Sequence, residues 1–476
     1  MATPSIWKHL PVNRSTAARI TSSLKIHPVI ARLLVTRGIS SEDEAKLFLW
    51  PTLEQLHDPL LMADIDIAVD RILKAIQRYE RIAVHGDYDV DGVTATVILY
   101  RILSMLGANV IHYIPDRLSD GYGLRPEGID RLKATGSTLV VTVDCGIRSS
   151  AAAERALAVG VDLIITDHHQ PEPTLPPALA VLNPRRSDCR YPNKNLAGVG
   201  VVFKLIQALC EQTGHRHWLS AVLKLVALGT IADVVPLQGE NRVMARLGLN
   251  ELAKGQNSAG LQALIDSCRL TGKRIGSHDI GFVLAPRINA AGRMATPDIA
   301  VKLLLATGQG EHADAKVLAQ TLERENSRRR IEEDEVFQAA MQLIESNSEV
   351  RDGNILIVWG EKWHRGVIGI VASKLRERFN RPALVFSVEG GLAHGSARSV
   401  PGVQLLDAIE ECGDLLEQFG GHSQAAGVVI RTAYLNTLRT RLAAVVDREL
   451  TAEQLSRSFE IDSKLRLSEI TSSLME

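Results

Sequence analysis

The chain has 476 residues, more than a single hydrophobic core usually supports, so two or more domains are expected. Its 54 Lys and Arg residues balance 55 Asp and Glu residues, and the net charge of -1 excludes a uniformly basic nucleic-acid-binding surface but permits a local basic groove. Five scattered cysteines without CxxC spacing argue against a disulfide framework and a structural zinc site, and they favour a reducing cytoplasm.

The N-terminal ten residues mix Pro, Lys and His without a long apolar core, so neither a signal peptide nor a membrane anchor is expected. From residue 82 to residue 182, short β-branched runs alternate with helical stretches, which is typical of βαβ units and a parallel sheet. The expected strands are Arg81–Val84, Asn109–Ile114, Thr138–Val143, Val161–Thr166 and Ala180–Leu182. Ligands of such open sheets bind beyond the carboxyl ends of the strands.

The middle of the chain has apolar residues at helical spacing. The expected helices are Val199–Leu209, Trp218–Leu228, Arg242–Ala253 and Gly281–Ile288. Residues 311 to 346 follow without proline and with charges of both signs at short spacing, which favours one long solvated helix between domains. A second α/β pattern runs from Asn354 to Val446.

Five polar clusters are each placed where a parallel strand is expected to end. They are His85–Gly92, Asp144–Gly146, Asp167–His169, Asp233 and Asn289–Arg293. Carboxylates and imidazoles repel one another and are costly to desolvate unless a cation offsets both effects, so their concentration indicates a metal site.

The clusters suit two divalent cations. Asp89 and Asp91 can each face a different cation, Asp144 can bridge them, and His168 and Asp233 can complete the second site. Two such ions about 3.5–4 Å apart hold the attacking and leaving oxygens of a phosphoryl displacement and lower the pKa of a bound water. The ligand types suit Mn²⁺ or Mg²⁺ better than Zn²⁺ and leave the metal's identity open.

Each cluster also has an ordinary structural interpretation. The Asp87–Gly92 string resembles a calcium loop, but Val97 and Ile98 occupy the stretch where an EF-hand needs its closing acid. Asp144 could cap the following helix, and a His-His pair is usually structural or exposed. Asp233 favours a ligand role, because an unpaired charge inside an apolar run would be costly.

Together, these motifs resemble the DHH phosphoesterase family and, more narrowly, the bacterial RecJ-type single-strand-specific exonucleases. The resemblance covers about residues 82 to 446. Its motifs in the first half are Asp87–Gly92, Val143–Gly146, Asp167–His169, Ala197–Gly200, Gly229–Pro236 and Asn289–Arg293. Those in the second half, which look like a companion substrate-binding domain, are Trp363–Ile370, Gly395–Ser399 and Phe419–His422.

The resemblance implies an α/β fold, with a parallel-sheet DHH domain joined by a long helix to a smaller α/β DHHA1 domain. The implied boundaries are an N-terminal segment (1–55), the DHH catalytic domain (56–310), the connecting helix (311–350), the DHHA1 substrate-binding domain (351–450) and the start of a truncated or absent OB-like domain (451–476). The implied activity is 5′-to-3′ removal of mononucleotides from single-stranded DNA, in recombination and repair.

Site roles follow from the same resemblance, residue by residue. The implied metal ligands, for two Mn²⁺ or Mg²⁺ ions, are His85, Asp89, Asp91, Asp144, His168 and Asp233, although His85, like Asp87, can instead lie behind the ligands. The implied catalytic residues are His169, beside the scissile phosphate, Asp144 and Arg293. The implied substrate-binding residues are Arg117, Arg293, Ser396, Arg398, Gly420, Gly421 and His422.

The implied partners are single-stranded DNA, a single-strand-binding protein and a RecQ-type helicase, in the bacterial cytoplasm and with no membrane. One alternative is a DHH phosphodiesterase of short oligonucleotides or cyclic dinucleotides, and the length and the Arg293 motif favour the exonuclease over it. Another is a non-catalytic replication scaffold, which would be expected to have lost ligands that are present here.

Overall fold

The computed structural model describes residues 6–116, 123–450 and 458–475, which form two compact units. Unit 2 contains residues 46–326, and unit 1 contains residues 1–45 and 327–476. The boundary at residue 326 falls within the long helix α15 (His312–Ser346), where the sequence predicts a continuous connecting helix. The other domain boundaries expected from the sequence stay predictions.

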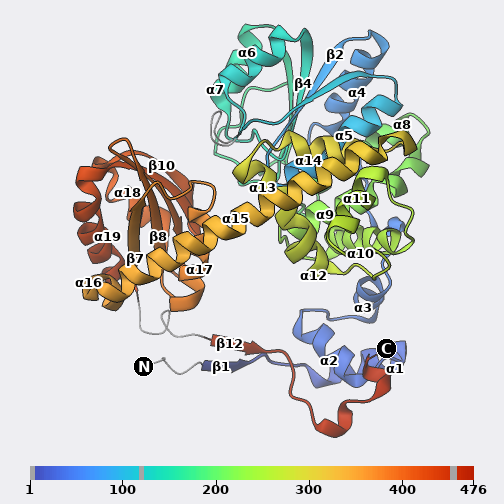
Figure 1. The fold of residues 1–476 in the computed structure, drawn as a ribbon. Helices are drawn as coiled ribbons and strands as arrows, with labels where there is room; N and C mark the ends of the chain where they lie inside the picture. The colour runs from blue at the N-terminus through green and yellow to red at the C-terminus, as the bar shows by residue number, and fades with distance from the viewer. Residues whose placement is uncertain (1–5, 117–122, 451–457, 476) are drawn as a thin grey trace. The chain divides into compact units, whose positions relative to one another are not determined.

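Unit 2 is built on a five-stranded parallel sheet with the strand order β3-β2-β4-β5-β6. Figure 1 labels β2 and β4 of this sheet. The predicted α/β class and the parallel sheet are confirmed. The strands are β2 (Arg81–Gly86), β3 (Asn109–Tyr113), β4 (Ser137–Val143), β5 (Asp162–Thr166) and β6 (Ala180–Leu182).

Alternate side chains of this sheet enter two separate cores. Ile82 and Val84 point into the larger core, whereas Ala83 between them points into the smaller one. The helices that contribute to the larger core include α4 (Ile65–Gln77), α5 (Val90–Met105), α8 (Gly198–Gln212), α9 (Leu219–Ala232) and α14 (Asp298–Leu305). The opposite face is covered by α6 (Pro126–Ala134) and α7 (Ser150–Ala158).

Helix α5 is buried almost all round, which its nearly continuous apolar sequence allows. Its two buried threonines remain satisfied, because Thr94 donates to the carbonyl of Val90 and Thr96 donates to that of Gly92. The helix therefore holds the loop that precedes it against the core of unit 2.

Further helices of unit 2 contribute to the larger core. They are α10 (Gly239–Ala253), α11 (Ala259–Ser267), α13 (Ala285–Met294) and the first part of α15, whereas the short α12 (Ser277–Asp279) has no buried residue. The predicted helix Gly281–Ile288 is wrong in its bounds: a π-helical segment covers Ile280–Leu284, and α13 begins at Ala285. Pro286 explains the break, because proline lacks the N–H of a helix interior and is tolerated in a first turn.

Unit 1 contains a mixed sheet with the strand order β10-β11-β9-β8-β7, in which only the β7–β8 pair is parallel. Helices α18 (Leu405–Glu410) and α19 (Leu435–Glu449) share its apolar core, and α17 (Ile368–Phe379) follows β7. The strands are β7 (Leu356–Glu361), β8 (Ala383–Glu389), β9 (Leu392–Arg398), β10 (Leu416–His422) and β11 (Ala425–Arg431).

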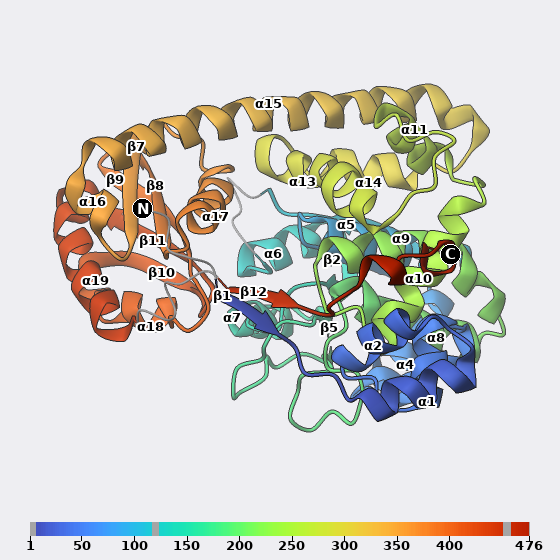
Figure 2. The same cartoon turned by 90° about the horizontal axis from the view of Figure 1, so that it is seen from below.

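The two ends of the chain meet in unit 1. Strand β1 (Ile6–His9) pairs in parallel with β12 (Ser458–Ile461), as Figure 2 shows in dark blue and red. The sequence does not predict this pairing. The other helices are α1 (Arg14–Leu24), α2 (Pro28–Thr36), α3 (Glu42–Leu49), α16 (Ser348–Asp352) and α21 (Ser472–Met475). Within the described ranges, no helix is long and apolar enough to cross a membrane.

Candidate metal centre and phosphate-binding residues

The polar clusters of unit 2 gather at the point of the sheet where successive strands lie on opposite sides of β2. From β2 the chain passes to β3 on one side, and it then returns to β4 on the other side of β2. A crevice opens at the carboxyl ends of strands at such a switch point. Asp87, Asp89 and Asp91 follow β2, and Asp144 follows β4, so the sheet order itself brings these carboxylates together.

Asp89 and Asp91 belong to the first turn of α5. Asp89 is the N-cap, and its Oδ1 accepts a hydrogen bond from the N–H of Gly92 at 3.1 Å. The buried Asp91 carboxylate accepts hydrogen bonds from the backbone N–H groups of Gly198 (2.6 Å) and Val199 (2.7 Å). These donors begin α8, so the positive end of that helix stabilises the charge of Asp91.

Asp144 lies in a strained position directly beyond β4. Its φ of 61° is left-handed, a conformation that few residues other than glycine, asparagine and aspartate adopt. Its Oδ1 is 3.2 Å from Nε2 of His168. A Cβ atom on Gly198 would come within 2.4 Å of the same oxygen, so α8 can approach Asp144 only because residue 198 is glycine.

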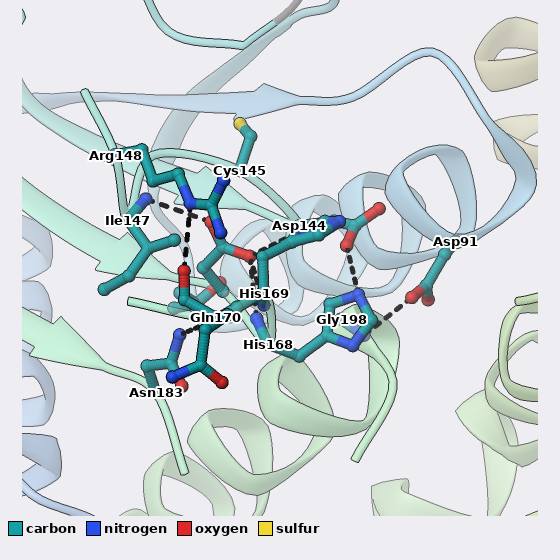
Figure 3. A network of polar contacts seen from close by, with 12 residues as sticks. Asp91, Asp144, Cys145, Ile147, Arg148, His168, His169, Gln170, Asn183 and Gly198 are labelled. Atoms are coloured by element: carbon teal, nitrogen blue, oxygen red, sulfur yellow. Dashed lines mark hydrogen bonds and ion pairs between the residues drawn. The ribbon is translucent and has the colours of Figure 1, made fainter. Parts of the chain in front are cut away.

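Asp167 fixes the two histidines that follow it. Its Oδ1 accepts hydrogen bonds from the backbone N–H groups of His168 (2.7 Å) and His169 (3.0 Å) and contacts Nδ1 of His169 at 2.7 Å (Figure 3). Its Oδ2 accepts from the N–H of Ile147 at 3.0 Å. Burial alone would raise the pKa of Asp167, but these donors lower it, so the residue is a stable anion.

Three sets of side chains could each hold a metal ion, because one ligand atom from every member lies within 4.8 Å of the others. The sets are Asp87, Asp89 and Asp144; Asp91, His168 and Asp233; and Asp144, His168 and His169. Asp144 and His168 each belong to two sets, and Figure 3 shows Asp91 and Asp144 on two sides of the His168 ring. Two neighbouring cations could therefore share these residues.

The carboxylates of this cluster resist ionisation. Burial and then the charge of Asp233 raise the pKa of Asp91 to about 7, and burial and then the charge of Asp89 raise that of Asp233 to about 7. The pKa of Asp144 is also raised, first by burial and then by Asp91. Among the described residues, the buried Oδ1 of Asp144 accepts no hydrogen bond. A divalent cation would offset these costs, and the oxygen-rich donors fit Mn²⁺ or Mg²⁺.

His169 has the opposite electrostatic character. Desolvation would lower its pKa, but the hydrogen bond and charge of Asp167, followed by the charges of Asp233 and Asp87, raise it to about 9. In the metal-free chain the ring is therefore protonated at neutral pH. Its side chain is 44% exposed, so the proton can reach a bound substrate.

The sequence left two residues near the end of β2 open between ligands and residues behind the ligands. His85 is buried with Nδ1 3.7 Å from the Cys145 sulfur and its ring 5.5 Å from that of Tyr113, and it belongs to none of the three sets found among the described residues. Its assignment as a metal ligand stays a prediction. Asp87, which the sequence left open as a residue behind the ligands, lies with Asp89 in one set. The i, i+2 spacing of Asp87 and Asp89 in one loop was the sequence signal that could have identified Asp87 as a ligand.

Asp233 and the Asn289–Arg293 motif do not follow strands, contrary to the expectation. Asp233 is the C-cap of α9, because the apolar run before it is a helix. The Asn289 motif lies on α13, whose Asn289 Oδ1 accepts a hydrogen bond from the N–H of Val90 at 3.1 Å. Helix α13 thus holds the loop before α5, and Arg293 lies one turn further along it.

Four of the five predicted substrate-binding residues of unit 1 share one face of its sheet. Across β11, Ser396 and Gly420 both lie opposite Gly427, and Arg398 and His422 both lie opposite Ala425. Gly421 belongs to the alternate row, beside two alanines of the unit's core. Arg398 Nη1 donates to the Ser396 hydroxyl at 3.1 Å. The predicted Arg117 lies outside the described residues.

Comparison with known proteins agrees with this arrangement. The model of the DHH family, N-terminal domain, matches residues 81–230, and that of the DHHA1 domain matches residues 352–448. The single-stranded-DNA-specific exonuclease RecJ of Bacillus subtilis (strain 168) is 40% identical over 99% of this chain and 59% of its own length. The RecJ of Escherichia coli (strain K12) is 36% identical over 94% of this chain and 79% of its own length.

Solved structures extend the likeness to three dimensions. RecJ of Thermus thermophilus in complex with Mn²⁺ superposes with a TM-score of 0.85 at 31% identity, over 99% of this chain and 67% of that one. The same protein in complex with Mg²⁺ gives a TM-score of 0.78 at 29% identity, over 99% of this chain and 65% of that one. The chain belongs to the RecJ family of single-stranded-DNA-specific exonucleases, which combines DHH and DHHA1 domains.

Proposed function

We propose that this chain hydrolyses single-stranded DNA from the 5′ end and releases 5′-mononucleotides, with two Mn²⁺ or Mg²⁺ ions as cofactors. The observation that carries the proposal is the position of Asp144, which belongs to two of the three candidate metal sets. A carboxylate shared in this way suits a pair of cations that acts on one phosphate. The chain covers 59% of the length of one relative, so the activity of the whole protein is part of the proposal.

The metal ligands of the proposed centre are Asp87, Asp89, Asp91, Asp144, His168 and Asp233, with His85 kept as a further candidate. When bound, the two ions polarise the phosphate and lower the pKa of water. In the reaction, a water oxygen adds to phosphorus and the bond to the 3′ oxygen breaks. His169, whose pKa is raised, would give that oxygen its proton, and Asp167 would hold the ring in position.

Arginines are proposed to hold the strand. The guanidinium of Arg293, and that of Arg117 by family resemblance, would bind phosphate oxygens in unit 2, because a planar donor fork matches their geometry. In unit 1, the face that carries Ser396, Arg398 and His422 would bind the backbone, and the glycine at residue 420 leaves room for close approach. Gly421 is proposed to contribute backbone atoms only.

The wider context rests on family resemblance alone. We propose a role in DNA recombination and repair in the bacterial cytoplasm, with a single-strand-binding protein and a RecQ-type helicase as partners. An OB-like domain after residue 451 would add strand contacts, and it stays a prediction.

A degradation assay with four substrates tests the proposed activity: single strands labelled at the 5′ or the 3′ end, a blunt duplex, and a cyclic dinucleotide. With Mn²⁺, the 5′-labelled strand should release labelled mononucleotide from the first turnovers, while the 3′-labelled strand should shorten stepwise. The duplex should persist. Preferred cleavage of the cyclic dinucleotide would instead support the phosphodiesterase alternative, and release of 3′-terminal label first would overturn the polarity.

A further inference from the structure

Two consecutive arginines follow β6 and have contrasting surroundings. Arg186 is buried and fully engaged: it pairs with Asp64 at 2.5 Å and with Asp188 at 2.7 Å. Arg185 is half-buried and forms no ion pair within the described residues. Its one side-chain hydrogen bond there runs from Nε to the carbonyl of Lys194 at 3.2 Å, which leaves the two terminal nitrogens available to a ligand.

Arg185 is tied to the catalytic histidines through Asn183. The buried Asn183 amide donates to the carbonyl of His169 at 2.9 Å, and its Oδ1 accepts a hydrogen bond from the backbone N–H of Arg185 at 2.8 Å (Figure 3 labels Asn183 beside His169). This turn fixes where the Arg185 side chain leaves the backbone relative to the strand end that carries His168 and His169.

A permanent cation that forms no ion pair within the described ranges, and that is anchored at Nε beside the turn that contacts His169, has the properties of a phosphate-binding side chain.

We propose that Arg185 binds the scissile phosphate of the DNA strand beside His169. The inference rests on the proposed function and extends it. Within the described part of unit 2, Arg185 would be a second arginine, in addition to Arg293, that contacts the substrate. Its Nε bond to Lys194 holds the planar group in place, and its terminal nitrogens donate to the phosphate oxygens.

Single-turnover cleavage of a 5′-labelled strand at increasing concentrations of the full chain tests this role. It yields a half-saturation concentration and a saturating rate, which are measured from about 50 to 200 mM KCl. Arg185→Gln should raise the half-saturation concentration about tenfold or more and should reduce its log–log salt slope by about 0.7, the value for one lost phosphate contact on a single strand. Arg185→Lys should keep the salt slope, because it retains the charge.

The matched control is Arg190→Gln, which removes an exposed arginine of the same loop and should change neither quantity. If Arg185→Gln binds and cleaves with the wild-type slope, the residue is structural and the inference is wrong, while the proposed function stands. If Arg185→Gln binds Mn²⁺ more tightly than the wild type and keeps the wild-type salt slope, the inference is also wrong, because Arg185 would then only offset the charge of Asp233. If the wild-type chain neither binds nor cleaves single strands, both proposals fail.

Discussion

The imidazole Nδ1 of His169 lies 2.7 Å from Oδ1 of Asp167, the residue that also accepts the backbone N–H groups of both histidines. The contact leaves Nε2 as the nitrogen that can face a substrate, and it keeps the ring charged through a pKa of about 9. Asp167 thereby acts through His169 and is a positioning residue.

Replacing Asp167 with asparagine should move the pH dependence of cleavage. The amide oxygen can still accept the hydrogen bonds from the N–H groups of His168 and His169, although the amide NH2 cannot accept the one from Ile147. The asparagine lacks the charge that raises the pKa of His169. His169 is protonated below its pKa, so a lower pKa should shift the alkaline limb of the single-turnover rate profile to lower pH. Asp162→Asn, at the other end of β5, is the matched control and should leave the profile unchanged. An unshifted alkaline limb in Asp167→Asn would contradict the role of His169 as proton donor.

Gly198→Ala should impair the metal centre despite placing a better helix former in α8. The new Cβ would lie 2.4 Å from Oδ1 of Asp144, so either that carboxylate or the helix must move. A displacement near 1 Å can cost about 100-fold in rate. Gly200→Ala in the same helix is the control, because its Cβ would come no closer than 3.3 Å to its neighbours, the flexible end of Met244 and the side chain of Leu196. The prediction fails if cleavage and Mn²⁺ affinity are equal in the two variants.

Metal-free protein should lose stability as the pH rises from about 4 to 7. Asp91 and Asp233 have pKa values of about 7 in the folded chain, against 3.8 in the reference state. Between these values the folded chain binds more protons than the unfolded chain, so the free energy of unfolding falls with rising pH. The stabilisation by Mn²⁺ should therefore be larger at pH 8 than at pH 5.5. Thermal unfolding at both pH values, with and without Mn²⁺, measures this stabilisation. An increase in unfolding temperature on Mn²⁺ addition that is equal or smaller at pH 8 would refute the prediction.

The buried pair of Lys204 and Glu240 should be important for stability. Both side chains are almost completely buried, and Nζ of Lys204 is 3.1 Å from Oε1 of Glu240. Lys204→Met leaves the carboxylate without its charge partner and should lower the free energy of unfolding by about 3–5 kcal/mol. Lys254→Met, which breaks an exposed pair with Glu251, should cost at most about 1 kcal/mol. Urea unfolding of both variants measures the two free energies of unfolding, and similar decreases in the two variants would contradict the prediction.

Local pattern was sufficient to predict much of unit 2. Alternating β-branched and helical runs predicted the five parallel strands, and the positions of Asp144 and His168 after strands predicted their convergence. The contact between Asp91 and the start of α8 could not be predicted, because it joins residues 107 positions apart through backbone N–H groups that any sequence provides. The pairing of β1 with β12 depends on tertiary contacts in the same way.

Glycine residues made two strands of unit 1 difficult to predict from the sequence. The motifs that contain Gly395 and Gly420 lie within β9 and β10, although glycine is unfavourable in strands and an isolated Gly-Gly-His usually marks a turn. β9 and β10 pair with the two sides of β11, and this pairing stabilises both strands. Such pairing cannot be inferred from local sequence.

The most direct measurement is the rate at which chelator-stripped protein releases the 5′-terminal nucleotide of a single strand as Mn²⁺ is added back. Activity should be absent in chelator and should return as two ions bind per chain, because Asp144 is shared between neighbouring metal sets. Asp144→Ala should stay inactive at every Mn²⁺ concentration, whereas Asp130→Ala, at an exposed ion pair on α6, should respond like the wild type. Cleavage by the stripped protein, or a wild-type response from Asp144→Ala, would contradict the shared-carboxylate metal centre.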